Sequence, residues 1–348
     1  MNFKERNPEF FIKKPFWPCT NQEMVDLSEK FDIEYHQIGK SAGNRPIYAM
    51  YMGEKEEIPQ KTTLNGALSG GHPEDFFRSR DKKQVLAIIS SIHGVEVEGC
   101  VTLGNLFSVA ATGEDLKGKD WPRLQKELKK YRLVIVPIGN PDGRARSKIN
   151  TLKGATDEDV NFYNQGLKKD GSILGWPECF RRLPVPVDEM EYLGGYYNDD
   201  GYTLSSCDPF VGAGTPEMKA FFDLFRAERP DCYLEFHSCG AGPFFLNSRN
   251  SIPSSYQQKN SQIRAAVASR HLQEGLRPRV LRARKPSDKF GLQSYVTQIA
   301  GSLPLLFEFP NGQKHNPYKL EEIVDVGLFL LEELLVFGSR FRFRPDWN

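Results

Sequence analysis

The sequence predicts an α/β fold built on a mostly parallel sheet. Four short apolar runs have the composition of strands buried on both faces, at residues 85–91, 133–137, 232–236 and 305–309. Segments with helical spacing of apolar residues lie between or after them, at residues 96–111, from 215 onward, 256–274 and 320–337. Strands that alternate with helices are typical of a parallel sheet covered by helices.

The first part of the chain has a different pattern. Residues 1–20 carry charges and several prolines, which predicts an extended arm. Thr20 and Glu23 have the spacing of a capping box, so a helix should follow. We therefore divide the chain into an N-terminal arm with the first helix, residues 1–34, and a main domain, residues 35–348. Within the main domain, residues 143–214 are rich in Gly, Asp, Pro and Tyr, which predicts long surface loops.

Composition excludes several classes of protein. The 348 residues include 46 Lys and Arg against 45 Asp and Glu, a net charge of +1, so we expect no nucleic-acid or membrane partner. The six cysteines are scattered without a C-x-x-C pair, which favours reduced thiols. The sequence contains neither a signal-peptide pattern nor an apolar run of the ~18–20 residues that span a membrane, so we expect a soluble, cytoplasmic protein.

A histidine and a glutamate follow the first buried strand in the pattern His93-Gly-Val-Glu96. Open α/β sheets form their binding sites at the carboxyl ends of strands. The spacing lets an imidazole and a carboxylate face one point, and a catalytic zinc takes three such ligands plus a water. In isolation, the tetrapeptide is more often a surface pair at the start of a helix.

Two other residues, much later in the chain, are candidates for the third ligand and the general base that a catalytic zinc site needs. His237 ends a buried strand, where period-two alternation places it on the same side as Glu235. It could be a third metal ligand, although a lone histidine at a strand end is more often held by hydrogen bonds. Glu308 lies amid Leu and Phe, where a carboxylate is costly to bury. It lies on a solvated edge or is paired with a nearby Arg or Lys, or it is a general base tuned by its surroundings.

Taken in order, these residues resemble the zinc carboxypeptidase family, from about residue 35 to residue 337. The motifs that carry the resemblance are, in chain order, Gly39-Lys-Ser41 with Asn44-Arg-Pro-Ile-Tyr48, Ser91-Ile-His-Gly-Val-Glu96, Gly139-Asn-Pro-Asp-Gly143, Thr215-Pro-Glu217, Phe236-His-Ser238 and Phe307-Glu-Phe309. Several are common singly, but their order and spacing together are specific.

The resemblance implies a three-layer α/β/α sandwich around a mixed, mostly parallel sheet of about eight strands, and it makes residues 35–348 a catalytic domain. It implies one Zn2+ per chain, held by His93, Glu96 and His237. Glu308 matches the carboxylate that deprotonates the zinc-bound water and later protonates the leaving amine. Asp159 matches an aspartate that orients the first histidine.

The substrate site departs from the family pattern. Asn161 matches an asparagine that holds the terminal carboxylate of the substrate, but Phe162 stands where the family has an arginine. Another cation, Arg181, Arg182 or Lys285, replaces that arginine, or the substrate has no carboxylate there, or the loop is aligned a residue or two out of place. An aromatic ring would suit an apolar group, so we count Phe162 with Asn161 as substrate-binding.

The groups that surround the scissile carbonyl are less clearly matched. The tyrosine that closes over the substrate in the family has no clear equivalent between Lys285 and Phe290. Arg144 and Arg146, which follow the Asn-Pro-Asp-Gly turn, are the nearest candidates for the cation that polarises the carbonyl.

We therefore expect a zinc-dependent metallopeptidase that hydrolyses an amide bond in a peptide or a small amino-acid-derived substrate. A close rival is a zinc amidohydrolase or deacylase for a small amino-acid derivative or a cell-wall peptide, with the same metal site. A rival from another class is a non-catalytic binding module that retains the fold. The intact set of His93, Glu96, His237 and Glu308 argues against the binding module.

Overall fold

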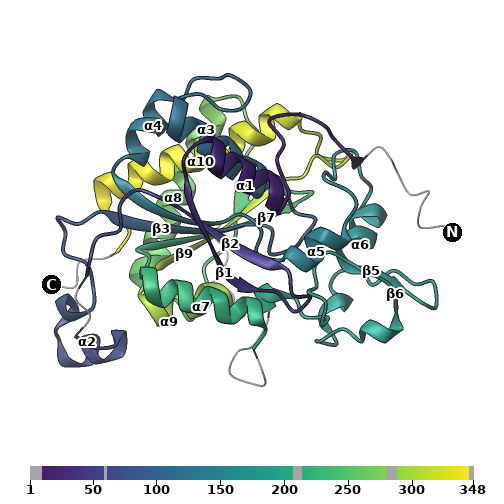
Figure 1. Ribbon diagram of the computed structural model, residues 1–348, viewed down its shortest axis with the longest axis horizontal. Helices are drawn as coiled ribbons and strands as arrows, with labels where there is room; N and C mark the ends of the chain where they lie inside the picture. The colour runs from purple at the N-terminus through teal and green to yellow at the C-terminus, as the bar shows by residue number, and fades with distance from the viewer. Residues whose placement is uncertain (1–9, 59–60, 207–213, 280–287, 345–348) are drawn as a thin grey trace.

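The computed structural model describes residues 10–58, 61–206, 214–279 and 288–344. Its centre is a seven-stranded sheet of described residues in the order β1–β2–β4–β3–β7–β9–β8 (Figure 1). The strands are β1 Glu34–Lys40, β2 Pro46–Met52, β3 Gln84–Ile89, β4 Tyr131–Val136, β7 Cys232–Cys239, β8 Phe244–Phe245 and β9 Leu303–Pro310. The predicted α/β fold is confirmed, with seven strands in this sheet where about eight were expected.

The four apolar runs of the sequence form the parallel centre of the sheet. β4, β3, β7 and β9 are parallel neighbours, whereas β1, β2 and β8 run antiparallel beside them. The carboxyl ends of the four parallel strands therefore meet along one edge. In the register of β7 and β9, His237 lies opposite Glu308.

Helices cover both faces of the sheet (Figure 1). One face packs against α1 Asn21–Lys30, α3 Glu98–Thr112, α4 Pro122–Leu128, α8 Ser254–Gln273 and α10 Leu320–Phe341, and the other against α7 Pro216–Glu228 and α9 Leu292–Ala300. The strands alternate between two apolar clusters, so that in β3 Leu86 faces the first layer and Ala87 the second. The result is the three-layer arrangement that the resemblance implied.

The N-terminal arm packs on the first of these layers. Trp17 and Met24 are buried in the same apolar cluster as the strands. Thr20 caps α1 through the predicted capping box with Glu23. The division of the chain after residue 34 stays a prediction.

The segment expected to be long loops contains more regular structure than its composition indicates. It holds α5 Pro141–Arg146, α6 Asp157–Gln165 and a small sheet of β5 Gly166–Lys168 and β6 Met190–Leu193. A short helix, α2 Leu64–Gly70, lies earlier in the chain. Among the described residues, none of the helices combines the length and the apolar surface that a membrane span requires.

Candidate active site

A tight turn after β3 carries the first two candidate ligands. Ser91 adopts a φ of 47°, in the left-handed region that residues other than glycine rarely enter. Its hydroxyl donates to the carbonyl oxygen of Glu96 at 3.1 Å. Gly94 passes so close to α5 that a Cβ there would lie 2.2 Å from the backbone nitrogen of Arg144. Because only glycine fits that position, the turn holds His93 and Glu96 in a defined place against the start of α5.

Three side chains converge at the carboxyl ends of β3 and β7. His93 Nδ1 lies 2.8 Å from Glu96 Oε1, and His237 Nδ1 lies 3.1 Å from Glu96 Oε2. The two Nδ1 atoms are 3.2 Å apart. All three side chains are buried, and their ligand atoms lie within 4.8 Å of one another. The structure thus brings together the three residues that the sequence analysis assigned to a metal.

This donor set fits a zinc ion. Zinc takes imidazole nitrogen and carboxylate oxygen at ~2.0–2.2 Å in a tetrahedral array, which places neighbouring ligand atoms ~3.3–3.5 Å apart. The observed separations of 2.8–3.2 Å are close to that spacing. Two buried imidazole nitrogens that face each other beside one carboxylate form an arrangement that a cation would stabilise.

Glu235 orients one of the histidines from behind. Its Oε1 lies 2.7 Å from His237 Nε2, and its side chain is buried. With Nε2 donating to a carboxylate, Nδ1 of His237 is left as the acceptor that faces the candidate metal position. Metal-binding histidines are commonly held in this way.

The pKa values at the centre follow from burial and from these contacts. Burial lowers the pKa of His93, although Glu96 opposes the effect. Burial also acts to lower the pKa of His237, but Glu235 and Glu96 outweigh it and raise the pKa well above its usual value. Burial acts to raise the pKa of Glu96, yet the two histidines hold it at about 2. The carboxylates thus favour positive charge at His237 Nδ1, the place that a proton or a bound cation would take.

Glu308 lies beside this group on β9. It is the residue in register with His237, and unlike the three candidate ligands it is only half-buried. Burial raises its pKa to about 7, while His237 lowers it and Glu96 raises it. A partly accessible carboxylate next to the three ligand atoms is placed as a general base requires.

Comparison with known proteins agrees with this geometry. The family model "Zinc carboxypeptidase" matches residues 21–277, well over half of the chain. The chain belongs to the zinc carboxypeptidase family. The matched region contains His93, Glu96 and His237 and ends before Glu308, so the placement of Glu308 rests on the structure. A search of curated proteins found no match.

Solved structures of metallocarboxypeptidases share the fold. A metallo-carboxypeptidase from Pseudomonas aeruginosa in complex with (2-guanidinoethylmercapto)succinic acid has a TM-score of 0.58 at 15% identity, covering 94% of this chain and 70% of that one. A metallo-carboxypeptidase from Burkholderia cenocepacia has a TM-score of 0.57 at 16% identity, covering 93% and 70%. Bovine thrombin-activatable fibrinolysis inhibitor has 0.55 at 14%, covering 94% and 98%. At such low identity the likeness concerns the fold, and this chain is a divergent member of the family.

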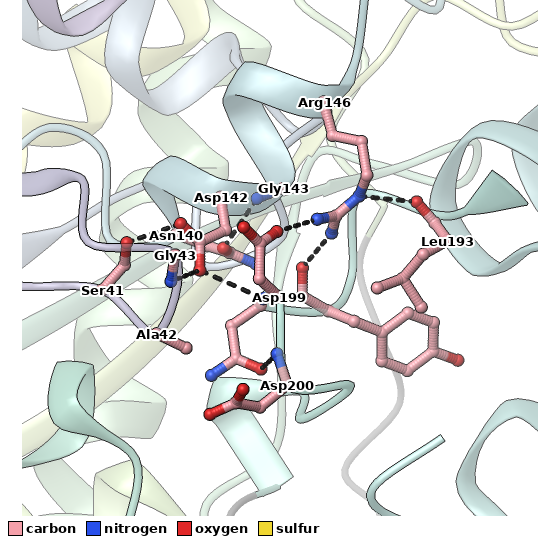
Figure 2. A network of polar contacts seen from close by, with 12 residues as sticks. Ser41, Ala42, Gly43, Asn140, Asp142, Gly143, Arg146, Leu193, Asp199 and Asp200 are labelled. Atoms are coloured by element: carbon pink, nitrogen blue, oxygen red, sulfur yellow. Dashed lines mark hydrogen bonds and ion pairs between the residues drawn. The ribbon is translucent and has the colours of Figure 1, made fainter. Parts of the chain in front are cut away.

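The two arginines expected at the scissile carbonyl bind backbone carbonyls instead. Arg144 donates to the carbonyl oxygens of Gly94 at 3.0 Å and Ser147 at 2.8 Å, and also to that of Ile149. Arg146 donates to the carbonyl oxygens of Leu193 and Tyr197 and forms an ion pair with Asp199 (Figure 2). These contacts use the guanidinium groups to hold loops together, which differs from the role that their position in the family pattern suggested.

The Asp-x-Asn-Phe segment likewise has local partners. Asp159 caps α6 through the backbone nitrogen and the hydroxyl of Thr156, and its contacts in the described structure do not include His93. Instead, Ser205 Oγ lies 3.5 Å from His93 Nε2. Phe162 is 3% exposed and packs between Tyr163 and Tyr192, so its ring is enclosed within an apolar cluster. Asn161 lies beside Gly175.

Two of the three cations that could replace the missing family arginine lie among the described residues. Arg181 and Arg182 are exposed and form ion pairs with Glu178 and Glu189. Lys285 lies outside the described residues.

Sequence analysis missed two residues of this site. Glu235 was placed on the side of His237 by the alternation of the strand, but it was given no role. Tyr196 was not singled out, yet its ring stacks on His93 with centroids 3.6 Å apart and planes 15° from parallel. Burial raises the pKa of Tyr196 well above its usual value, and the charges of Glu96 and Glu308 raise it further.

Proposed function

We propose that this chain is a zinc-dependent hydrolase that cleaves an amide bond in a peptide or a small amino-acid-derived substrate. The observation that carries the proposal is the convergence of three buried ligand atoms, from His93, Glu96 and His237, with Glu308 next to them in register. In this proposal the three residues hold one zinc ion per chain and Glu308 is the general base. The membership of the family supports the proposal.

In the reaction, bound zinc would act as a Lewis acid and lower the pKa of water toward ~7. Glu308 takes a proton from the attacking water as the water oxygen bonds to the carbonyl carbon. It then gives that proton to the nitrogen as the carbon–nitrogen bond breaks. Glu235 keeps His237 oriented throughout, because its contact with Nε2 does not involve the reacting atoms.

The metal content of purified protein tests this proposal. We expect about one zinc per wild-type chain and loss of zinc in His93→Ala and His237→Ala, because two protein ligands seldom retain a metal. His271→Gln is the matched control, since His271 is a buried histidine in α8 whose Nε2 donates to the carbonyl of Val326. Full zinc in either alanine variant would refute the assignment.

A second candidate function is an amidohydrolase or deacylase for a small amino-acid derivative or a cell-wall peptide. The enclosure of Phe162 favours it, because this position holds no guanidinium that could grip a terminal carboxylate. A bidentate charge-assisted pair is worth ~3 kcal/mol or more, or ~100-fold in kcat/KM. The test compares N-acyl dipeptides with their C-terminal amides, and a preference for the free acid above ~100-fold would exclude this candidate.

A panel of peptides, acyl amino acids and peptidoglycan fragments distinguishes a non-catalytic binding module from an enzyme. A zinc-loaded protein that hydrolyses none of the peptides, acyl amino acids and peptidoglycan fragments, yet binds one of them, would favour the binding module. The expected absence of nucleic-acid and membrane partners and the expected cytoplasmic location stay predictions from composition.

A further inference from the structure

A braced loop holds Tyr196 over the candidate metal centre. The backbone nitrogen of Gly94, next to His93, donates to the carbonyl oxygen of Gly195 at 2.7 Å, and the backbone nitrogen of Tyr196 donates to Asn164 at 2.9 Å. Asn140 Nδ2 lies 3.3 Å from the carbonyl oxygen of Gly195. These contacts hold the peptide unit between Gly195 and Tyr196, which directly precedes the Tyr196 side chain.

A network of charges anchors the same loop at its far end (Figure 2). Asp142 is fully buried and accepts hydrogen bonds from Ser41 at 2.5 Å and from the backbone nitrogen of Asp199 at 3.1 Å. Asp199 in turn lies between two arginines, Arg45 at 2.6 Å and Arg146. The backbone three residues after Tyr196 is therefore tied to Asp142 and to two arginines.

The hydroxyl of Tyr196 differs from the polar groups around it. Its ring lies flat on His93, at 3.6 Å between centroids, and the residue is half-buried. Within the described part of the chain, the hydroxyl makes no hydrogen bond. The neighbouring tyrosine is the opposite case, because the hydroxyl of Tyr197 donates to the carbonyl oxygen of Cys179 at 3.3 Å and its ring is fully buried. The unpartnered hydroxyl is thus available to a ligand at the centre.

We propose that the hydroxyl of Tyr196 donates the hydrogen bond that supports the carbonyl oxygen of the substrate as it becomes negatively charged, the role in which Arg144 or Arg146 was expected. The inference rests on the proposed function. The guanidinium groups of both arginines are directed to loop carbonyls, whereas Tyr196 stacks on a candidate ligand and its hydroxyl has no hydrogen-bond partner among the described residues.

The chemistry requires no further reactant. As the water oxygen bonds to the carbonyl carbon, the π electrons of the carbonyl move onto its oxygen, and Glu308 receives the proton of the water. The Tyr196 hydroxyl keeps its proton and only donates a hydrogen bond to that oxygen. When the carbon–nitrogen bond breaks, the carbonyl reforms and the nitrogen takes the proton from Glu308. A fixed donor of this kind acts most strongly on the transition state, where the charge is largest.

The variant Tyr196→Phe tests the hydroxyl alone, because phenylalanine keeps the ring that stacks on His93. We expect kcat to fall ~10²–10³-fold with KM and zinc content unchanged, as for loss of one oxyanion donor. Tyr197→Phe is the matched control and should keep wild-type kcat. Melting temperature and zinc content of both variants establish that fold and metal are intact.

A binding measurement provides a readout that does not depend on turnover. Acetohydroxamate binds metals through two oxygens, and its affinity for the cobalt-substituted protein can be followed in the visible spectrum. We expect Tyr196→Phe to bind it ~10–100-fold more weakly, the value of one hydrogen bond to a charged group, while cobalt affinity stays the same.

The outcomes separate the two proposals. If Tyr196→Phe is within threefold of wild type in kcat and in acetohydroxamate affinity, or if it loses metal, the assignment of the hydroxyl is overturned. If wild-type protein holds zinc but hydrolyses no substrate, the proposed function fails, and acetohydroxamate affinity still decides whether the hydroxyl faces the metal. Wild-type protein without metal would overturn both.

Discussion

Buried charges at the two ends of the parallel strands have different kinds of partner. At the amino ends, Arg132 of β4 meets Glu228 through two contacts of 2.9 and 3.2 Å, and Asp231 before β7 meets Arg344 at 3.2 Å. At the carboxyl ends, the ion-pair partners of Glu96 and Glu235 are histidines. An acid matched with an arginine is complete as it stands, whereas two imidazoles and an acid that face one point are completed by a cation.

The two sets of buried charges also differ in what they hold together. Burying charge carries a desolvation cost at both ends of the strands. At the amino ends, arginines also bind backbone carbonyls: Arg229 donates to the carbonyl oxygens of Phe76 and Ile58. Those contacts tie loops to the sheet. At the carboxyl ends, the side chains of His93, Glu96 and His237 instead face one point. Mutations at the amino ends should therefore change stability, and mutations at the carboxyl ends should change metal binding and turnover.

The largest expected effect is that of Glu308→Gln on turnover. Glutamine keeps the shape of the side chain but cannot accept a proton, so kcat should fall ~10²–10⁴-fold with zinc and fold retained. Glu332→Gln is a matched control, because Glu332 is a buried glutamate in α10 with Arg123 and Arg270 as partners. Steady-state kinetics on a substrate from the panel would show the effect, and activity within tenfold of wild type would remove Glu308 from the mechanism.

The next effect concerns stability at the amino ends. Glu228→Gln leaves Arg132 buried without its counterion and should lower the free energy of unfolding by ~3–5 kcal/mol, without loss of zinc. Urea unfolding followed by circular dichroism measures it. The double variant Arg132→Met with Glu228→Leu should recover much of that loss, because removal of both charges removes the desolvation cost. A change below ~1 kcal/mol in the single variant would show that water or Lys55 replaces the partner.

Local patterns in the sequence predicted the α/β fold, and the resemblance to the family singled out the groups at the centre as a set. The apolar runs at 85–91 and 232–236 became β3 and β7, which are parallel neighbours in the sheet. His93 follows β3 and His237 lies near the carboxyl end of β7, so this pairing brings the two histidines close.

The remaining residues could not be assigned in this way because their contacts depend on how the loops close. Asp159 matched a family motif, but Thr156, three residues earlier, engages its carboxylate in the capping box of α6. Arg146 donates to the carbonyl oxygen of Leu193, 47 positions further along the chain. Tyr196 stacks on His93 from a segment whose backbone is bound by Gly94, Asn164 and, through Asp199, by Asp142. No periodicity in the sequence reports such contacts.

A smaller effect is expected where a carboxylate acts on the metal through a ligand. Glu235→Gln removes the negative charge behind His237 Nε2 while keeping a hydrogen-bonding group there, so zinc affinity should fall ~10–100-fold. Competition with a chelator measures the affinity, and Glu228→Gln is the control from the opposite end of the strands. If Glu235→Gln binds zinc as tightly as wild type, the contact with His237 does not orient the ligand.

The smallest expected effect comes from His271, which is buried like His237 but whose hydrogen-bond partner among the described residues is a backbone carbonyl. Burial lowers the pKa of His271 to about 4, whereas the carboxylates raise that of His237. Because the ordinary pKa of histidine is ~6.5, the unfolded chain gains a proton at this residue as the pH falls from ~6.5 toward 4 while the folded chain does not. The contribution of His271 to stability is therefore intact above pH ~6.5 and is lost below it, by about 2 kcal/mol between pH 7 and pH 5.

His271→Gln isolates this contribution, because glutamine can donate to the Val326 carbonyl but does not titrate. Urea unfolding of variant and wild type at pH 7, 6 and 5 should show a pH dependence that is smaller in the variant by about 2 kcal/mol. The metal centre is present in both proteins, so its own pH dependence cancels in the difference. Identical pH dependence in the two proteins would mean that His271 accepts a proton in the folded state, and that a buried histidine needs no carboxylate to remain charged in this core.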